Sequence, residues 1–259
     1  MKLHILNLCS RLYRLFVIAC LFFLASCSST TGGEAGDPRD PIEPINRVFW
    51  TFTWDYADKY IAKPAAMAYT TYTPSLLRSG LHNMALNLNE PSSIINNILQ
   101  AKISHAVTSS KRFLLNSSVG LFGFFDPATD FGWTGDQEEF GEVLGLYGVG
   151  NGPYFIFPGL GPKSVREELG DYVDEYYWPL AVINFWPNVA RKVIVGLEKR
   201  AQLADQESLI RESFDPYEFV KNAYFQNMNY KVYDGNPPVE VDETEEARLD
   251  AFMDEFDIE

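Results

Sequence analysis

Cys27 is the residue whose sequence surroundings point to the most specific chemistry. It follows Leu24-Ala25-Ser26 at the end of an apolar run over residues 15–25, and the segment before this run has basic residues but no acidic ones. This pattern is typical of an export signal that ends in a lipobox, where the cysteine thiol takes a diacylglycerol group before cleavage, and the run is too short for a transmembrane helix. We therefore expect residues 1–26 to be removed and Cys27 to become the lipidated first residue.

Side chains that could act as nucleophiles or bases are sparse in the mature chain. The histidines His82 and His105 each stand alone, outside any metal-ligand spacing, and no Gly-x-Ser-x-Gly elbow is present. A hydrolase needs a nucleophile and a base that activates it, so we predict no enzyme and no metal. Some carboxylates could pair for acid–base work, although a solvated helix face is the favoured interpretation for them: Glu138, Glu139, Glu142, Asp171, Asp174 and Glu175.

Two glycine-rich stretches resemble nucleotide-binding loops but fail on physical grounds. In the stretch 159–164, Pro162 stands before Lys163, where a phosphate-binding loop needs a glycine whose backbone N–H can donate. The stretch 148–152 lacks the third glycine of the dinucleotide fingerprint at its required spacing. We therefore expect no nucleotide and no cofactor.

The mature chain is strongly acidic. Residues 1–26 hold three of the 21 basic residues, so their loss leaves 18 basic residues against 35 acidic ones, a formal charge of −17. Binding to nucleic acid needs a basic patch for the phosphates, so nucleic acid is not an expected partner. Much of the acidity lies in residues 236–259, which we expect to form a disordered tail, with a partner-binding tail as the alternative.

The rest of the mature chain divides into a tether and one domain. Residues 27–39 are rich in Ser, Thr, Gly and Asp, which predicts a flexible lipidated tether, and residues 40–235 have the size of a single domain. We expect Ser92 or Ser93 to cap one helix and Asp215 to cap the last. Apolar periodicity predicts helices over residues 46–61, 75–89, 92–103, 104–118, 189–203, 205–211 and 215–233.

Three apolar segments have alternative interpretations. The helix over residues 46–61 carries aromatic residues over most of its circumference, so it is equally compatible with a buried core and with a face toward lipid. The uncharged segment 143–162 contains six Gly and three Pro, which excludes a plain transmembrane helix and predicts a pore-lining loop or, alternatively, a surface hairpin. The uncharged segment 176–190 predicts an interfacial segment or a buried corner.

Several short motifs follow one another in the body in a specific order. They are Asp40-Pro41 with Asn46-Arg47, Tyr147-Gly148-Val149-Gly150-Asn151-Gly152-Pro153-Tyr154, Pro158-Gly159-Leu160-Gly161-Pro162 leading to Arg166, Arg200-Ala201, and Asp215-Pro216-Tyr217 with Ala223-Tyr224. In this order they resemble the MlaA family, also called VacJ, of outer-membrane phospholipid-trafficking lipoproteins. The resemblance covers about residues 40–230.

The resemblance implies an all-α fold, a single-domain ring of amphipathic helices embedded in the inner leaflet of the outer membrane, with a central amphipathic channel. It implies a lipid-anchored protein on the periplasmic leaflet that removes mislocalised phospholipid from the outer leaflet and so maintains lipid asymmetry. The implied partners, besides phospholipids and the membrane, are trimeric porins and a soluble periplasmic phospholipid carrier. Ser28 agrees with this location, because Asp there would be the usual signal for retention in the inner membrane.

The resemblance also implies two functional segments. Asn46 and Arg47 belong to the channel entrance, and a mobile gating loop includes Tyr147, Gly148, Gly150, Gly152, Pro153 and Tyr154. The sequence departs from the family at Ile45, where an aromatic residue is common, and at Glu167, where Asp often follows the arginine. The alternative functions are an envelope lipid hydrolase and a scaffold lipoprotein that only binds porins.

Overall fold

The computed structural model describes residues 37–135 and 137–238. The chain divides into two compact units, Met1–Pro38 and Arg39–Glu259, and the fold described below is that of the second unit. The predicted signal peptide, Cys27, most of the predicted tether and the acidic tail beyond position 238 lie outside the described residues.

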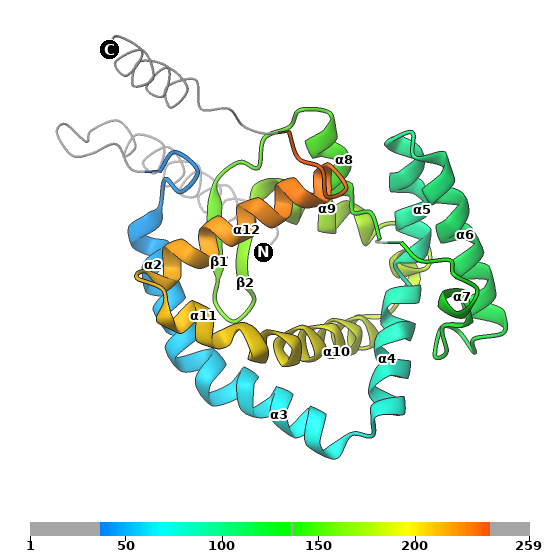
Figure 1. Cartoon of the computed structure of the whole chain (residues 1–259), viewed down its shortest axis with the longest axis horizontal. Helices are drawn as coiled ribbons and strands as arrows, with labels where there is room; N and C mark the ends of the chain where they lie inside the picture. The colour runs from blue at the N-terminus through cyan, green and yellow to red at the C-terminus, as the bar shows by residue number, and fades with distance from the viewer. Residues whose placement is uncertain (1–36, 136, 239–259) are drawn as a thin grey trace, which may run out of the picture. The chain divides into compact units, whose positions relative to one another are not determined.

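Helices dominate the described part of the chain, as the predicted all-α class requires (Figure 1). They are α2 (Glu43–Thr51), the π-helical η2 (Phe52–Ala62), α3 (Lys63–Tyr72), α4 (Ser75–Asn87), α5 (Glu90–Leu99), α6 (Ile103–Ser118), α7 (Pro127–Asp130), α8 (Phe140–Leu146), α9 (Val165–Asp174), η3 (Leu180–Val182), α10 (Phe185–Leu203), η4 (Ala204–Gln206), α11 (Glu207–Glu212) and α12 (Pro216–Val232). One antiparallel hairpin departs from that class, with β1 (Tyr154–Phe157) paired to β2 (Gly161–Ser164).

The elements of this unit pack in a closed circuit, which Figure 1 shows face on. α2 continues through η2 into α3, α3 packs against α10, and α10 contacts α4. From α4 the contacts pass to α6, α5 and α8, and α8 packs on both α9 and α12. β2 contacts α9, and its partner strand β1 returns to α2. The contacts therefore end at the helix from which they start, as the predicted ring requires.

Apolar and polar side chains in this unit are distributed in an unusual way. The main cluster of buried apolar side chains is small and mostly aromatic, and consists of Tyr154, Ile156, Tyr217, Tyr224 and Phe225. Fully buried polar side chains lie in the same unit, and they include Asn46, Asn96, Asn97, Ser93 and Ser164. Large apolar side chains are exposed on many helices, including Val48, Phe52, Tyr60, Ile61, Tyr72, Leu114 and Trp186. A soluble monomer does not ordinarily expose this much large apolar surface.

The aromatic helix predicted over residues 46–61 forms and extends in both directions, from α2 through η2 to the end of α3. The core interpretation is wrong for one stripe of it, because Phe52, Tyr56 and Tyr60 are more than half exposed. Trp50 is only partly exposed and packs against the aromatic cluster. Among the described residues, no helix is both long and apolar enough to cross a membrane.

The structure corrects the predicted cap of one helix and confirms another. α5 begins at Glu90, so Pro91 lies in its first turn, where its missing N–H costs no hydrogen bond. Neither predicted serine caps α5, since the Ser92 hydroxyl donates to the carbonyl of Asn89 and the buried Ser93 hydroxyl accepts from the N–H of Glu138. Asp215 does cap α12, accepting from the N–H groups of Tyr217 and Glu218.

The two uncharged segments adopt short irregular structures. The segment 143–162 holds the end of α8, a glycine-rich turn, strand β1 and the tip of the hairpin. The segment 176–190 holds η3 and the start of α10; Leu180 is buried there, whereas Trp178, Phe185 and Trp186 are strongly exposed. The buried-corner interpretation of this second segment is therefore wrong for its largest side chains.

Candidate functional site

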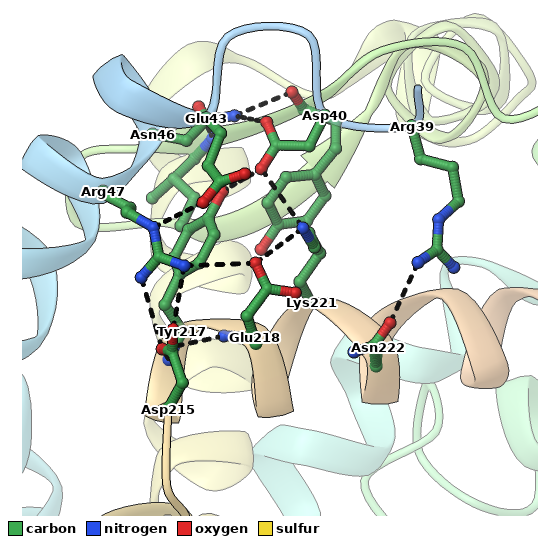
Figure 2. Close-up of polar contacts among 12 residues, drawn as sticks. Arg39, Asp40, Glu43, Asn46, Arg47, Asp215, Tyr217, Glu218, Lys221 and Asn222 are labelled. Carbon is green, nitrogen blue, oxygen red and sulfur yellow. Dashed lines mark hydrogen bonds and ion pairs between the residues drawn. The ribbon is translucent and has the colours of Figure 1, made fainter. Parts of the chain in front are cut away.

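Asn46 joins the start of the domain to the strand that follows the glycine-rich loop. Its side chain is fully buried, and its Nδ2 donates to Asp40 Oδ1 at 2.7 Å and to the carbonyl of Tyr154 at 3.0 Å. Its Oδ1 accepts from the N–H of Ile156 at 3.0 Å. One amide therefore links α2, the preceding turn and β1, which lies more than 100 residues away in the sequence (Figure 2).

Arg47, the next residue along, faces the N-terminus of α12. Its guanidinium donates to both carboxylate oxygens of Asp215, at 3.3 and 2.9 Å, and to Glu43 at 2.7 Å. It also lies 4.4 Å from the ring centroid of Tyr217. The hydrogen bond from Arg47 holds the pKa of Asp215 below its usual range. The carboxylate that caps α12 is thus held by the residue that follows Asn46.

Asp40 completes this arrangement from the other side. The hydroxyl of Tyr217 donates to Asp40 Oδ2, and the ammonium of Lys221 lies 3.7 Å from the same oxygen and 2.8 Å from Glu218. Burial and the bond to Asp40 raise the pKa of Tyr217. We call this set the α2–α12 cluster: Asp40, Glu43, Asn46, Arg47, Asp215, Tyr217, Glu218 and Lys221 (Figure 2).

Sequence reasoning does not single out a role for four members of the cluster, namely Glu43, Tyr217, Glu218 and Lys221. Tyr217 stands in a quoted family motif, but nothing in its spacing indicates a contact with Asp40, 177 positions away. Lys221 is 1% exposed in the structure, and a lysine in the middle of a helix is ordinarily predicted to be solvated.

The two ends of the predicted gating loop have different environments. Tyr154 is fully buried in the aromatic cluster, and its N–H donates to the carbonyl of Arg39 at 2.9 Å. Tyr147 is 71% exposed, although its hydroxyl reaches the carbonyl of Leu99 at 2.8 Å. The structure therefore brings Tyr154 together with Asn46, whereas Tyr147 lies beside α5.

Between these ends, the loop is held by Arg166 and shaped by glycine. Arg166 donates from its side chain to the carbonyl of Val149 at 2.9 Å and from its backbone N–H to the carbonyl of Asn151 at 3.1 Å. Gly148 and Gly152 have φ values of 82° and 68°, a region that other residues rarely adopt. Gly150 and Pro153 are exposed. Arg166 thus fixes the base of the turn, while a Cβ added to Gly150 would meet no atom within 4 Å.

The predicted solvated face of carboxylates is wrong for its first members. Glu138 and Glu142 are each 6% exposed. Glu138 accepts from Gln100 Nε2 at 2.7 Å, and burial together with the hydrogen bond to Glu138 raises the pKa of Glu142 to about 9. Burial also raises the pKa of Asp174 to about 6, although Asn96 and the N–H of Phe140 donate to its carboxylate. These groups join α5, α8 and α9 instead of facing solvent.

One group of side chains offers a possible set of metal ligands. His105, Glu138 and Asp234 present ligand atoms within 4.8 Å of one another. The ammonium of Lys102 pairs with Asp234 at 2.5 Å and with Glu138 at 3.3 Å. A lysine side chain therefore already supplies the positive charge that these two carboxylates require.

The comparisons with known proteins place the whole described body in one family. A sequence model of the MlaA lipoprotein family matches residues 38–231. The chain belongs to this family. The prediction from the ordered motifs is thereby confirmed, and the match includes both the α2–α12 cluster and the glycine-rich loop.

Relatives and a solved structure resemble the chain over most of its length. The intermembrane phospholipid transport system lipoprotein MlaA of Escherichia coli K12 is 35% identical over 210 residues, which are 80% of this chain and 83% of that protein. The MlaA of Haemophilus influenzae is 33% identical over 220 residues, 82% of this chain and 85% of that one. A structure described as "Structural basis for maintenance of bacterial outer membrane lipid asymmetry" is 37% identical, with a TM-score of 0.72, covering 74% of this chain and 98% of that chain.

Proposed function

We propose that this MlaA family member is a non-enzymatic phospholipid conduit that removes mislocalised phospholipid from the outer leaflet of the outer membrane and so maintains lipid asymmetry. The observation that carries the proposal is a closed circuit of helices that exposes many large apolar side chains and buries amides and carboxylates between its elements. A conduit for phospholipid needs polar groups for headgroups and apolar surface for acyl chains. The names of the relatives and the subject of the related structure support the same cargo.

The exposed apolar side chains mark the surface that we assign to the membrane. Val48, Phe52 and Tyr56 follow one another at helical spacing on α2 and η2, and Phe185 and Trp186 are 70% and 76% exposed at the start of α10. Aromatic side chains favour the boundary between lipid and water. The ring of helices would then lie in the periplasmic leaflet, with this surface toward the acyl chains.

Cys27 would anchor the body to that leaflet. The 13 residue steps from Cys27 to Asp40 can span at most about 45 Å when fully extended, which sets an upper limit on the distance between the anchor and the start of the body. Two or three acyl chains together bind a membrane firmly, since each buried methylene adds about 0.8 kcal/mol. Two partners complete the proposal: trimeric porins, with which the protein would associate, and a soluble periplasmic carrier, to which it would pass phospholipid.

We assign the gating role to residues 147–154. Arg166 and the buried Tyr154 hold this loop at its base, while Gly148, Gly150 and Pro153 are exposed and lie between them. Such a loop can move without breaking the packing on either side. Movement of the exposed part would open or close the path for lipid while β1 stays attached to Asn46.

Replacing Gly150 and Gly152 together by Val is expected to raise the amount of phospholipid in the outer leaflet. Gly152 has a positive φ, and its added Cβ would lie 3.2 Å from Val165 Cβ, whereas a Cβ on Gly150 meets nothing within 4 Å. Gly152→Val alone should therefore have the larger effect of the two single changes. The measurement is labelling of surface phospholipid in intact cells at matched protein level. Gly196→Val is the control, because Gly196 is exposed in open space on α10. Unchanged surface lipid in the double variant would contradict the gating role.

Deletion of the gene tests the proposed function itself. A strain without the protein should accumulate phospholipid in the outer leaflet and become sensitive to detergent, and the wild-type chain should restore both properties. If surface phospholipid and detergent resistance do not change on deletion, the transport function is wrong. Outer-leaflet phospholipid could also rise because a lipid hydrolase is missing. In that case the amounts of lysophospholipid or free fatty acid would also differ between the deletion strain and the wild type.

A further inference from the structure

A group of polar side chains with unpaired buried atoms lies where α3, α4 and α10 meet. Tyr69 belongs to α3, Arg78 and His82 belong to α4, and Glu198 belongs to α10, which packs against both other helices (Figure 1). Tyr69 Oη, Arg78 Nε and Glu198 Oε2 are all buried, and none of them has a hydrogen-bond partner among the residues that the structure describes. The guanidinium of Arg78 lies 5.8 Å from the ring centroid of Tyr69. A hydroxyl and a guanidinium N–H that can donate, and a carboxylate oxygen that can accept, are therefore free to bind a ligand.

Arg78 differs in this respect from Arg112 and Arg200, two other partly buried arginines of the chain. Arg200 is held by Asp58 and Glu207, and Arg112 by Glu90 and Asp126. Within residues 37–135 and 137–238, no ion pair joins the guanidinium of Arg78 to a carboxylate. A buried donor left unpaired destabilises the fold, and does so more when the group is charged. This cost is recovered when a ligand supplies the missing partners.

The charges around this group are arranged for a ligand that carries both signs. Arg78 and Glu198 both act on the phenol of Tyr69, whose pKa is raised mainly by burial, further raised by Glu198 and lowered by Arg78. Burial lowers the pKa of His82, so its imidazole is neutral at pH 7 and can donate without adding charge. Arg78 therefore offers a positive charge and Glu198 a negative one, and His82 adds a neutral imidazole that is influenced by Glu198.

The geometry points to a binding site for the headgroup of a zwitterionic phospholipid of the phosphatidylethanolamine type. The phosphate would accept from Arg78 Nε and from the hydroxyl of Tyr69, and the ammonium group would donate to Glu198. Large apolar side chains on the same two helices, α3 and α4, are exposed and can take the acyl chains, namely Met67, Tyr72 and Leu76. The assignment of a lipid as the ligand rests on the proposed function, since free phosphate shares the anionic half of this chemistry.

The test uses the full lipidated chain purified in dodecyl maltoside and measures bound lipid by native mass spectrometry. Phosphatidylethanolamine, phosphatidylglycerol and inorganic phosphate are titrated separately. Arg78→Gln should weaken the binding of both lipids about tenfold, because each lipid loses a hydrogen bond to a charged group. Tyr69→Phe should weaken both about threefold. Glu198→Gln should weaken phosphatidylethanolamine alone, because phosphatidylglycerol has no ammonium group.

Lys111→Gln is the matched control, since it removes one positive charge from an exposed position on α6 and should leave both affinities unchanged. Wild-type affinities in the Arg78 and Glu198 variants would overturn the site and indicate that the two side chains pair with each other. Equal loss of both lipids in Glu198→Gln, or displacement of lipid by inorganic phosphate at millimolar concentration, would overturn the zwitterionic lipid as the ligand. Either result leaves the surface-lipid phenotype of the deletion strain standing, so it is distinguishable from failure of the proposed function.

Discussion

Asn46→Leu is expected to lower the free energy of unfolding by about 3 kcal/mol, because it leaves three buried groups without partners at about 1 kcal/mol each. These groups are Asp40 Oδ1, the carbonyl of Tyr154 and the N–H of Ile156. Leucine has nearly the same shape as asparagine, so the loss reports hydrogen bonding more than packing. For a domain of this size, the melting temperature should fall by about 6–12 °C.

The measurement is thermal unfolding of the purified chain in detergent, followed by circular dichroism. Asn184→Leu is the control, since Asn184 is exposed and its side chain makes no capping hydrogen bond at the start of α10. A melting temperature within 2 °C or so of the wild type for Asn46→Leu would mean that water replaces the lost contacts, and that the α2–α12 cluster is not the fixed base of the loop.

The same substitution should also change lipid flux. The Asn46 side chain hydrogen-bonds both to Asp40 and to the backbone of β1. Its removal breaks two hydrogen bonds between the start of the domain and the buried end of the gating loop, and leaves the bond from the N–H of Tyr154 to the carbonyl of Arg39. Outer-leaflet phospholipid in cells that express Asn46→Leu at a normal level should therefore differ from wild type, in the direction set by whether the released loop stands open or closed.

The helices could be predicted because their periodicity is local. The spacing of apolar residues on α4, α6 and α12 is enough to place them within two or three residues, and Asp215 followed by Pro216 marks the start of α12. The boundary at α5 failed because Pro91 fits both the end of one helix and the first turn of the next. Only the fold decides between these two positions.

The site could be predicted in part, and for a different reason. Asn46 and Tyr154 entered through a family resemblance, and their mutual hydrogen bond spans 108 positions that no local pattern connects. The burial of Glu138 and Glu142 was missed because acidic residues at the start of a helix are ordinarily solvated. What buries them is the approach of α5 and α12 to α8, which is a property of the closed circuit.

The environment of the aromatic helix could not be predicted from the sequence either. Its sequence is compatible with a core and with a lipid-facing surface, because both environments favour apolar side chains. The structure buries one side of the helix and exposes another, with Trp50 packed against the aromatic cluster and Tyr56 and Tyr60 exposed. The distinction depends on which helices close the circuit, and a single sequence does not contain that information locally.

Glu142→Gln is expected to stabilise the protein at neutral pH and to flatten the dependence of its stability on pH. Burial and the hydrogen bond to Glu138 raise the pKa of Glu142 to about 9, from an ordinary value of 4.5. Between these two pH values the folded chain keeps a proton that the unfolded chain releases. Stability therefore falls as pH rises from about 4.5 to about 9, and the part of this loss that accrues by pH 7 is on the order of 3 kcal/mol.

Asp174 acts in the same direction over a lower window, because burial raises its pKa from 3.8 to about 6. Glutamine at position 142 can still donate to Glu138 but has no proton to lose, so Glu142→Gln should remove the Glu142 contribution between about pH 4.5 and pH 9 and leave that of Asp174 between about pH 3.8 and pH 6. Melting temperatures from pH 4 to pH 9 measure both windows. Glu168→Gln, at an exposed position of α9, is the matched control. A wild-type protein that becomes more stable from pH 6 to pH 9 would show that Glu142 is ionised in the fold and paired with Lys231, whose ammonium lies 3.4 Å away.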